Sequence, residues 1–228
     1  MPNTLCHIGI QLPLASATCR RNLLLWVVIA CILPDFPWIS LSLLLHTGWF
    51  NPYDLRLYTT IQASLFFTLT LCGILAAFSP TPGKVFALLG SNSLLHLLLD
   101  SLQVKWGNGV NLLAPFNWQM FQLNLSWPEA SITFFFTCVG FCWLLFSWKS
   151  LRNEPFPLKK PDKKGVVIIA LCLFSYTIGP LFFLSTAEEA DLYYLHTRRM
   201  KQERTQKPIA FDRVHYFSSD HTLQDFSC

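Results

Sequence analysis

The hydrophobic pattern divides the chain into long apolar stretches separated by short polar segments. Five stretches approach the roughly 20 apolar residues that a helix needs to cross about 30 Å of hydrocarbon: 23–45, 61–78, 84–102, 131–148 and 166–186. A shorter stretch, 4–19, comes first; it carries no charge, but Pro13 interrupts it and favours a short or half-inserted helix. The pattern predicts an all-α, polytopic transmembrane helical bundle of about five spans, preceded by this short helix.

Composition agrees with a membrane protein. Of the 228 residues, 52% are hydrophobic and 13% are charged, whereas about a quarter of the residues in soluble domains carry charge. The charges fall mainly between the apolar stretches, so the lipid bilayer is the expected partner and nucleic acid is not. The eight cysteines lie mostly inside apolar runs, which is typical of small buried hydrophobic residues and not of a disulfide framework.

Basic residues predict the orientation in the membrane and a separate tail. The segment 149–164 is rich in lysine and arginine, which places it in the cytoplasm, and counting back puts the loop 103–130 outside and Arg20-Arg21 inside. Residues 187–228 return to a soluble composition. We therefore divide the chain into a transmembrane domain, 1–186, and a soluble C-terminal tail, 187–228, in which 187–205 favour a polar helix and 208–217 a short strand.

Polar residues inside the third stretch are the strongest candidates for chemistry. Asn92, His96 and Asp100 recur every four residues, which places them on one helical face. A carboxylate near mid-membrane costs about 2.5–3.5 kcal/mol on insertion scales, which disfavours a lipid-facing position. An imidazole and a carboxylate at i and i+4 can bind one divalent ion. The alternative is a structural hydrogen bond within the membrane.

Three further residues carry groups that bind metals. Asp35 stands between two prolines in Leu33-Pro34-Asp35-Phe36-Pro37, which disrupt the helix and leave carbonyls to be satisfied within the protein. His7 lies in the first short helix and His46 follows the first long stretch. Asp35 as a helix cap, and the two histidines as residues of the membrane surface, are the simpler alternatives. A shared cation would, however, offset the desolvation of two carboxylates.

These residues, in this order, resemble a known family. The motifs are His7, Leu33-Pro34-Asp35, His46-Thr-Gly48, His96-Leu-Leu-Leu-Asp100-Ser101 and Gly109-Val-Asn-Leu-Leu-Ala-Pro115-Phe116. Over about residues 4–148 the chain resembles the bacterial membrane-bound metal-dependent hydrolases, also described as LexA-binding, inner-membrane-associated hydrolases. That family is distantly similar to the zinc-dependent phospholipase C and P1 nuclease group, which are all-helical phosphodiesterases.

The resemblance implies a multi-pass protein of the bacterial inner (cytoplasmic) membrane that hydrolyses a phosphate or other ester, including lipid-linked compounds. It implies that Asp35, His46, His96 and Asp100 bind one divalent ion, that His7 and a bridging Asp100 bind a second, and that Asp35 doubles as the catalytic general base. Zinc is the metal that the resemblance favours, although oxygen and imidazole ligands also suit manganese and iron.

The loop 103–130 is the predicted gate of this site. It follows Asp100 directly and combines glycines, which permit a tight turn, with tryptophans, which anchor at the headgroup level. The alternative for these aromatic residues is a plain interfacial belt.

Two other functions compete with hydrolysis. A non-catalytic membrane adaptor would bind a protein partner through its charged tail; the absence of a second histidine soon after His46 favours it. An ion-coupled transporter would use the same intramembrane acids, but the chain shows no inverted repeat.

Overall fold

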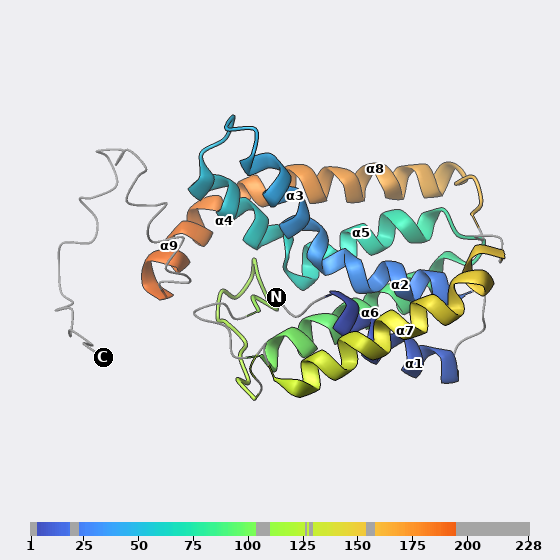
Figure 1. Ribbon diagram of the computed structural model, residues 1–228. Helices are drawn as coiled ribbons and strands as arrows, with labels where there is room; N and C mark the ends of the chain where they lie inside the picture. Colours follow the sequence, from blue (N-terminus) through green and yellow to red (C-terminus); the bar gives the residue numbers. More distant parts are fainter. Residues whose placement is uncertain are drawn as a thin grey trace, which may run out of the picture.

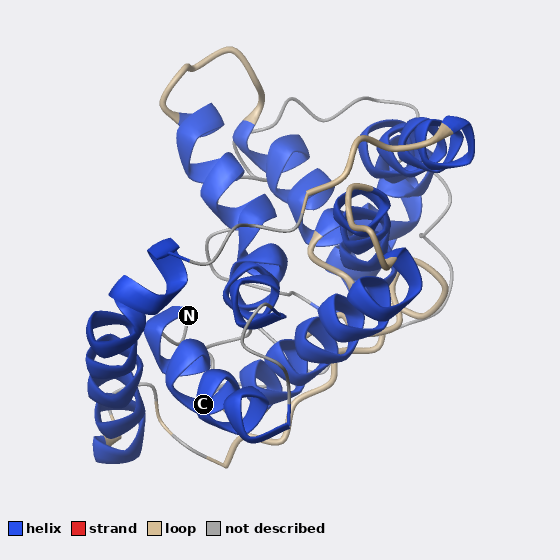
Figure 2. Ribbon diagram, turned by 90° about the vertical axis from the view of Figure 1, so that its right-hand side faces the viewer, coloured by secondary structure: helices blue, strands red, loops and turns tan. Residues whose placement is uncertain are grey.

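A computed structural model describes residues 4–18, 23–103, 110–125, 127, 130–153 and 158–194, and the described part is all helical (Figure 1). Apart from one isolated bridge between Val110 and Phe121, no strand occurs in these ranges. Figure 2 shows the same helices turned by a quarter circle, and the described segments between them are drawn as loops. The all-α prediction is confirmed for the described residues.

The helices follow one another with few long connections. In chain order, the elements are α1 (Thr4–Thr18), α2 (Leu24–Ile32), the 3-10 turn η2 (Leu33–Asp35), α3 (Phe36–Leu45), α4 (Pro52–Gln62), α5 (Leu65–Ala77), α6 (Pro82–Ser101), α7 (Ser131–Asn153), α8 (Lys163–Ile178), η3 (Gly179–Phe183) and α9 (Leu184–Tyr194).

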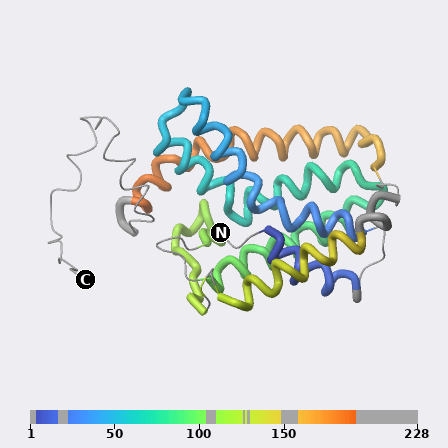
Figure 3. The backbone as a smooth tube through the Cα atoms, viewed as in Figure 1, coloured from blue at the N-terminus to red at the C-terminus, as the bar shows by residue number. Residues whose placement is uncertain are grey.

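Helices α2, α5 and α6 form the centre of the bundle. Trp26 of α2, Cys72 of α5 and Leu89 of α6 are fully buried in one apolar cluster between them. Helix α8 packs against α5 on one side, and α1 packs against α2 and α7 on the other (Figure 3). Each large apolar side chain that is buried in this way contributes about 1.5–3 kcal/mol to the stability of the bundle.

The contact between α1 and α7 depends on two glycines. A Cβ atom on Gly9 would overlap the carbonyl oxygen of Phe136, and one on Gly140 would overlap the carbonyl oxygen of Leu5. Small residues let the two backbones approach this closely, as they do in membrane helix pairs. This crossing fixes the place of α1, and therefore of His7, against the bundle.

Prolines and a polar break bend two of the predicted stretches. Pro34 is the second residue of the 3-10 turn and Pro37 lies in the first turn of α3, so the backbone changes direction around Asp35. Further on, the axes of α4 and α5 differ by 69° across the break at Ala63 and Ser64.

The prediction of about five spans is not supported. Among the described residues, two helical segments, Leu24–Leu45 and Lys163–Asp191, are long and apolar enough to cross a membrane, or three if the bent pair of α4 and α5 counts as one span. These helices suggest a membrane protein.

The other predicted stretches fall short for local reasons. The break before Leu65 shortens 61–78 to the 13 residues of α5. Polar residues at 91–93, 96 and 100 lower the hydropathy of α6, and the apolar part of α7 is the short segment Ser131–Ser147. The shorter stretch 4–19 forms α1, a 15-residue helix containing Pro13, as expected.

Helix α9 runs through the predicted start of the tail at residue 187. Ala187 and Asp191 are buried in the described structure, where α9 packs on α4. The helix predicted for 187–205 is therefore seen as far as Tyr194. The remainder of the tail, including the strand predicted for 208–217, lies outside the described residues, and the domain division stays a prediction.

Candidate metal centre

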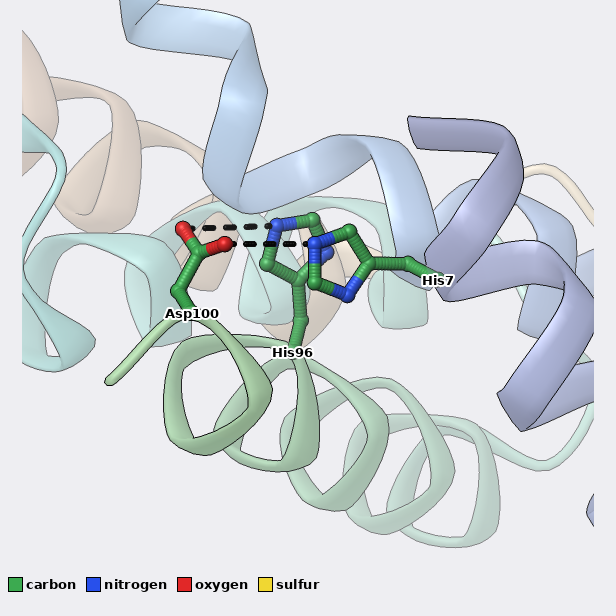
Figure 4. A group of neighbouring side chains, drawn as sticks. All are labelled: His7, His96 and Asp100. Atoms are coloured by element: carbon green, nitrogen blue, oxygen red, sulfur yellow. Dashed lines mark hydrogen bonds and ion pairs between the residues drawn. The ribbon is translucent and has the colours of Figure 1, made fainter. Parts of the chain in front are cut away.

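Three separate segments bring four of the predicted site residues together. His7 comes from the second turn of α1, Asp35 from the bend between η2 and α3, and His96 and Asp100 from the last two turns of α6. The i, i+4 spacing on α6 aims the imidazole and the carboxylate in the same direction, and Figure 4 shows the ring of His7 meeting them from α1. The tertiary fold thus joins residues that lie up to 93 positions apart.

The imidazole nitrogens and carboxylate oxygens of these side chains lie close together, but not every pair is within hydrogen-bond distance. His7 Nε2 lies 3.2 Å from Asp100 Oδ1. His96 Nε2 lies 3.6 Å from Asp35 Oδ1 and 4.0 Å from Asp100 Oδ2. Each oxygen of Asp100 therefore faces a different histidine. Distances of 3.6 Å and above are too long for a hydrogen bond.

The two imidazole rings are stacked. Their centroids are 3.7 Å apart and their planes differ by 14°, and both Nε2 atoms point toward Asp100 (Figure 4). Two imidazolium ions would repel each other at this distance. His7 lies outside the candidate spans, and burial lowers the pKa of its imidazole, although Asp100 opposes this shift. Burial thus favours the neutral ring of His7, which is the form that binds metals.

Several nitrogens of this cluster lack a hydrogen-bond partner among the described residues. Both ring nitrogens of His96 and Nδ1 of His7 are buried without one, and the side chain of His96 is completely inaccessible. A buried polar atom without a partner costs about 1–3 kcal/mol, and such an exception in a protein is explained by a bound water, a catalytic role or an ion.

The spacing fits the ligands of a cation. Two ligand atoms that each lie about 2.1 Å from the same ion are about 3.0–3.4 Å apart at octahedral and tetrahedral angles. The separation between His7 and Asp100 falls in this range, and the two separations of His96 exceed its upper limit by about 0.2 Å and 0.6 Å. Ligand atoms of His7, His96 and Asp100 all lie within 4.8 Å of one another. This cluster can hold a metal ion.

Asp35 is the N-cap residue of α3, but its side chain makes no capping hydrogen bond. Instead, the hydroxyl of Thr4 donates to Asp35 Oδ2 over 2.9 Å, while Oδ1 faces His96. The side chain is 8% exposed. The carboxylate thus belongs to the cluster and does not serve the helix that follows it. The general-base role of Asp35 stays a prediction.

His46 is not brought into the cluster. It is the exposed C-cap residue of α3, and its Nδ1 hydrogen-bonds the carbonyl oxygen of Ser42 on the same helix. The third member of the polar face on α6, Asn92, also bonds locally, through Nδ2 to the carbonyl oxygen of Leu88. Among the described residues, the cluster therefore consists of His7, Asp35, His96 and Asp100.

The described part of the predicted gate is attached to the end of α6. The amide of Leu123 donates to the carbonyl of Ser101, and that of Leu125 to Leu102, each over 2.7 Å. Trp118 packs against a core cluster, whereas Trp127 is 51% exposed. Trp106 and the glycines at 107 and 109 lie outside the described residues. The loop thus returns to the helix that carries Asp100, but gating stays a prediction.

The residue that sequence reasoning missed is Thr4. A threonine three residues before His7 has no distinctive motif, and its bond to Asp35 spans 31 positions. Only the contact between α1 and the bend at Asp35 reveals it.

Comparison of the chain with protein-family models, with curated proteins and with solved structures gives no match.

Proposed function

We propose that this protein is a membrane-bound, metal-dependent hydrolase that acts on a phosphate or other ester. The observation that carries the proposal is the convergence of two buried imidazoles and two carboxylates with separations of 3.2–4.0 Å. A divalent ion bound there supplies a Lewis acid that polarises an ester oxygen and makes water nucleophilic near neutral pH.

Charge supports a cation in this cluster. Asp35 and Asp100 bring two carboxylates into a largely buried cluster, and burying negative charge is costly without compensating donors or a cation. One divalent ion neutralises them. A second gives the site a net positive charge, which matches an anionic phosphoester.

The stacked rings support two ions. A histidine nitrogen binds an ion close to the plane of its ring, so two parallel rings do not share one ion without turning. The ring spacing of 3.7 Å lies within the range of about 3.5–4 Å between the ions of two-metal hydrolytic sites. In this arrangement His7 and Asp100 Oδ1 hold one ion, and His96, Asp35 and Asp100 Oδ2 hold the other. Zinc is the proposed metal, with manganese and iron as alternatives for the same ligands.

The two ends of the bundle differ in a way that suits a bacterial inner (cytoplasmic) membrane. Lys84, Lys160 and Lys163 lie near the turns at one end, where the amide of Lys159 donates to the carbonyl of Phe78. The C-terminal end of α6 lies at the opposite end of the bundle (Figure 1). By the positive-inside rule, the lysine-rich end faces the cytoplasm and the metal site lies toward the outer surface. We propose that the chain crosses the membrane several times and that the neighbouring helices shield the polar residues of α6 from lipid.

Exposed apolar side chains near the site support a lipid-linked substrate. Trp49, in the loop between α3 and α4, is 83% exposed, and Phe116 and Leu125, in the loop that returns to the end of α6, are 75% and 74% exposed. Aromatic and aliphatic residues of this kind enter the interface between headgroups and acyl chains. A substrate with a lipid anchor would reach the site from this interface.

Metal analysis of the detergent-purified protein, combined with a panel of phosphodiester, phosphomonoester and carboxylester lipids, tests the proposal. The wild type is expected to retain about two ions of zinc per chain and to hydrolyse a panel member, and His96→Ala and Asp100→Ala to lose both properties. His46→Ala is the matched control, because this histidine is exposed and lies outside the cluster. Equal and negligible metal in the wild type and both site variants would remove the metal site. Bound metal without turnover on any ester would remove hydrolysis.

The adaptor function is the second candidate, motivated by the charged tail 187–228. In that case Asp100→Asn retains its cellular function, whereas a chain that ends after Tyr194 loses it. The opposite pattern excludes the adaptor.

A further inference from the structure

Thr4 bonds a carboxylate of the metal cluster without belonging to the ligand set. Its hydroxyl lies 2.9 Å from Asp35 Oδ2. We propose that Thr4 is a positioning residue that orients Asp35 as a metal ligand, an inference that rests on the proposed metal site.

The two oxygens of Asp35 have different surroundings. Oδ2 accepts the hydroxyl proton of Thr4, whereas Oδ1 lies 3.6 Å from His96 Nε2. Asp35 makes no capping hydrogen bond to the start of α3, and Thr4 is the hydrogen-bond partner of Oδ2. One oxygen is thereby occupied and the other is left for the ion.

Thr4 and His7 lie three residues apart on α1 and therefore share one face of the helix. His7 meets Asp100 over 3.2 Å while Thr4 meets Asp35 over 2.9 Å. The same stretch of α1 thus supplies one ligand and orients another. The close crossing of Gly9 and Gly140 holds this helix in place.

If Thr4 orients Asp35, removal of the Thr4 hydroxyl lowers the affinity of the site for metal. Hydrogen bonds to ligating carboxylates fix their orientation, and their loss typically weakens metal binding by about 10–100-fold. Thr4→Val keeps the shape of the side chain and removes the hydroxyl, whereas Thr4→Ser keeps the hydroxyl. Thr60→Val is the matched control, because the Thr60 hydroxyl bonds a backbone carbonyl within α4, away from the cluster.

The experiment is a titration of the full-length, detergent-purified apoprotein with Co²⁺, followed by visible absorption and by competition with a chromophoric chelator. Thr4→Val is expected to bind Co²⁺ about 10–100-fold more weakly than the wild type, with an altered absorption spectrum. Thr4→Ser and Thr60→Val are expected to stay within about threefold, which is a small effect on this scale.

A double-variant cycle separates positioning from a general effect on folding. If Thr4 acts through Asp35, Thr4→Val weakens Co²⁺ binding in the wild type but adds nothing in the Asp35→Ala background. Equal affinity of Thr4→Val and wild type, or equal weakening in both backgrounds, overturns the proposal for Thr4 alone. A wild type that binds no Co²⁺, Zn²⁺ or Mn²⁺ contradicts the metal site itself.

Discussion

The bundle contains two groups of buried polar side chains, and they differ in how well hydrogen bonds within each group pair its polar atoms. At the contact of α4 and α9, the hydroxyl of Tyr53 donates to Asp191 Oδ2 over 3.0 Å, and both residues are almost fully buried. In the metal cluster, His96 Nε2 is also buried but has no hydrogen bond among the described residues, and its nearest carboxylates stand 3.6 Å and 4.0 Å away.

This difference separates a structural contact from a binding site. A buried pair that hydrogen-bonds internally stabilises the fold by itself. In the metal cluster His7 contacts Asp100, but the imidazole of His96 faces both carboxylates across distances too long for hydrogen bonds, so a cation bound there would add stability. The comparison predicts that metal acts on one group and not on the other.

The largest expected effect is stabilisation of the wild type by metal. At a free Zn²⁺ concentration about 1,000 times the dissociation constant, binding adds about 4 kcal/mol to the free energy of unfolding. His96→Ala is expected to lose this response, whereas Asp191→Asn keeps it. Thermal unfolding in detergent, with and without Zn²⁺, measures both. A response of His96→Ala equal to that of the wild type would show that the metal binds elsewhere.

The next effect concerns the helix that carries His7. Gly9→Ala places a Cβ atom against the carbonyl of Phe136, and overpacking of this kind costs up to about 3 kcal/mol. We expect α1 to move away from α7, so that Zn²⁺ affinity falls together with stability. Gly83→Ala is the control, since nothing lies within 4 Å of its Cβ position. Unchanged Zn²⁺ affinity in Gly9→Ala would mean that α1 does not position the site.

Removal of the Tyr53 hydroxyl tests the structural group. Tyr53→Phe deprives Asp191 of a donor, and hydrogen bonds to charged groups contribute about 1.5–3 kcal/mol, so the free energy of unfolding should fall by about 2 kcal/mol. Zn²⁺ affinity should stay as in the wild type. Chemical denaturation and chelator competition measure the two quantities. A loss of Zn²⁺ binding in Tyr53→Phe would erase the distinction between the groups.

The smallest effect is expected at His46. Its imidazole is exposed and bonds the carbonyl of Ser42, so His46→Ala should change stability by less than about 0.5 kcal/mol, as surface substitutions usually do. Zn²⁺ stoichiometry should not change. Loss of one bound ion in this variant would place His46 among the ligands, as the resemblance implies.

The sequence predicts the helical class and most of the cluster because these depend on local spacing. Hydrophobic runs identify the helices, and the four-residue interval between His96 and Asp100 places both on one face. Asp35 is recognisable because a carboxylate between prolines in an apolar run needs a partner. His7 joins them through the close packing of α1, which no periodicity reveals.

Other features depend on the tertiary structure and were not predicted correctly or not predicted at all. The prediction of about five spans is not supported, in part because the break at Ala63 and Ser64 leaves the apolar run at 61–78 only the 13-residue helix α5. His46 follows the bend at Asp35 closely in sequence, yet α3 carries it to an exposed position. The role of Thr4 arises from a contact between distant segments.

X-ray absorption spectroscopy of the zinc-loaded protein identifies the atoms that bind the metal. A metal centre at this cluster predicts a first shell of nitrogen and oxygen at about 2.0–2.2 Å with the outer-shell scattering of imidazole, and loss of the bound zinc, and with it of the spectrum, in His96→Ala. Sulfur at about 2.3 Å would place the metal on cysteines. That result, or identical spectra for the wild type and His96→Ala, would contradict a metal centre formed by His7, Asp35, His96 and Asp100.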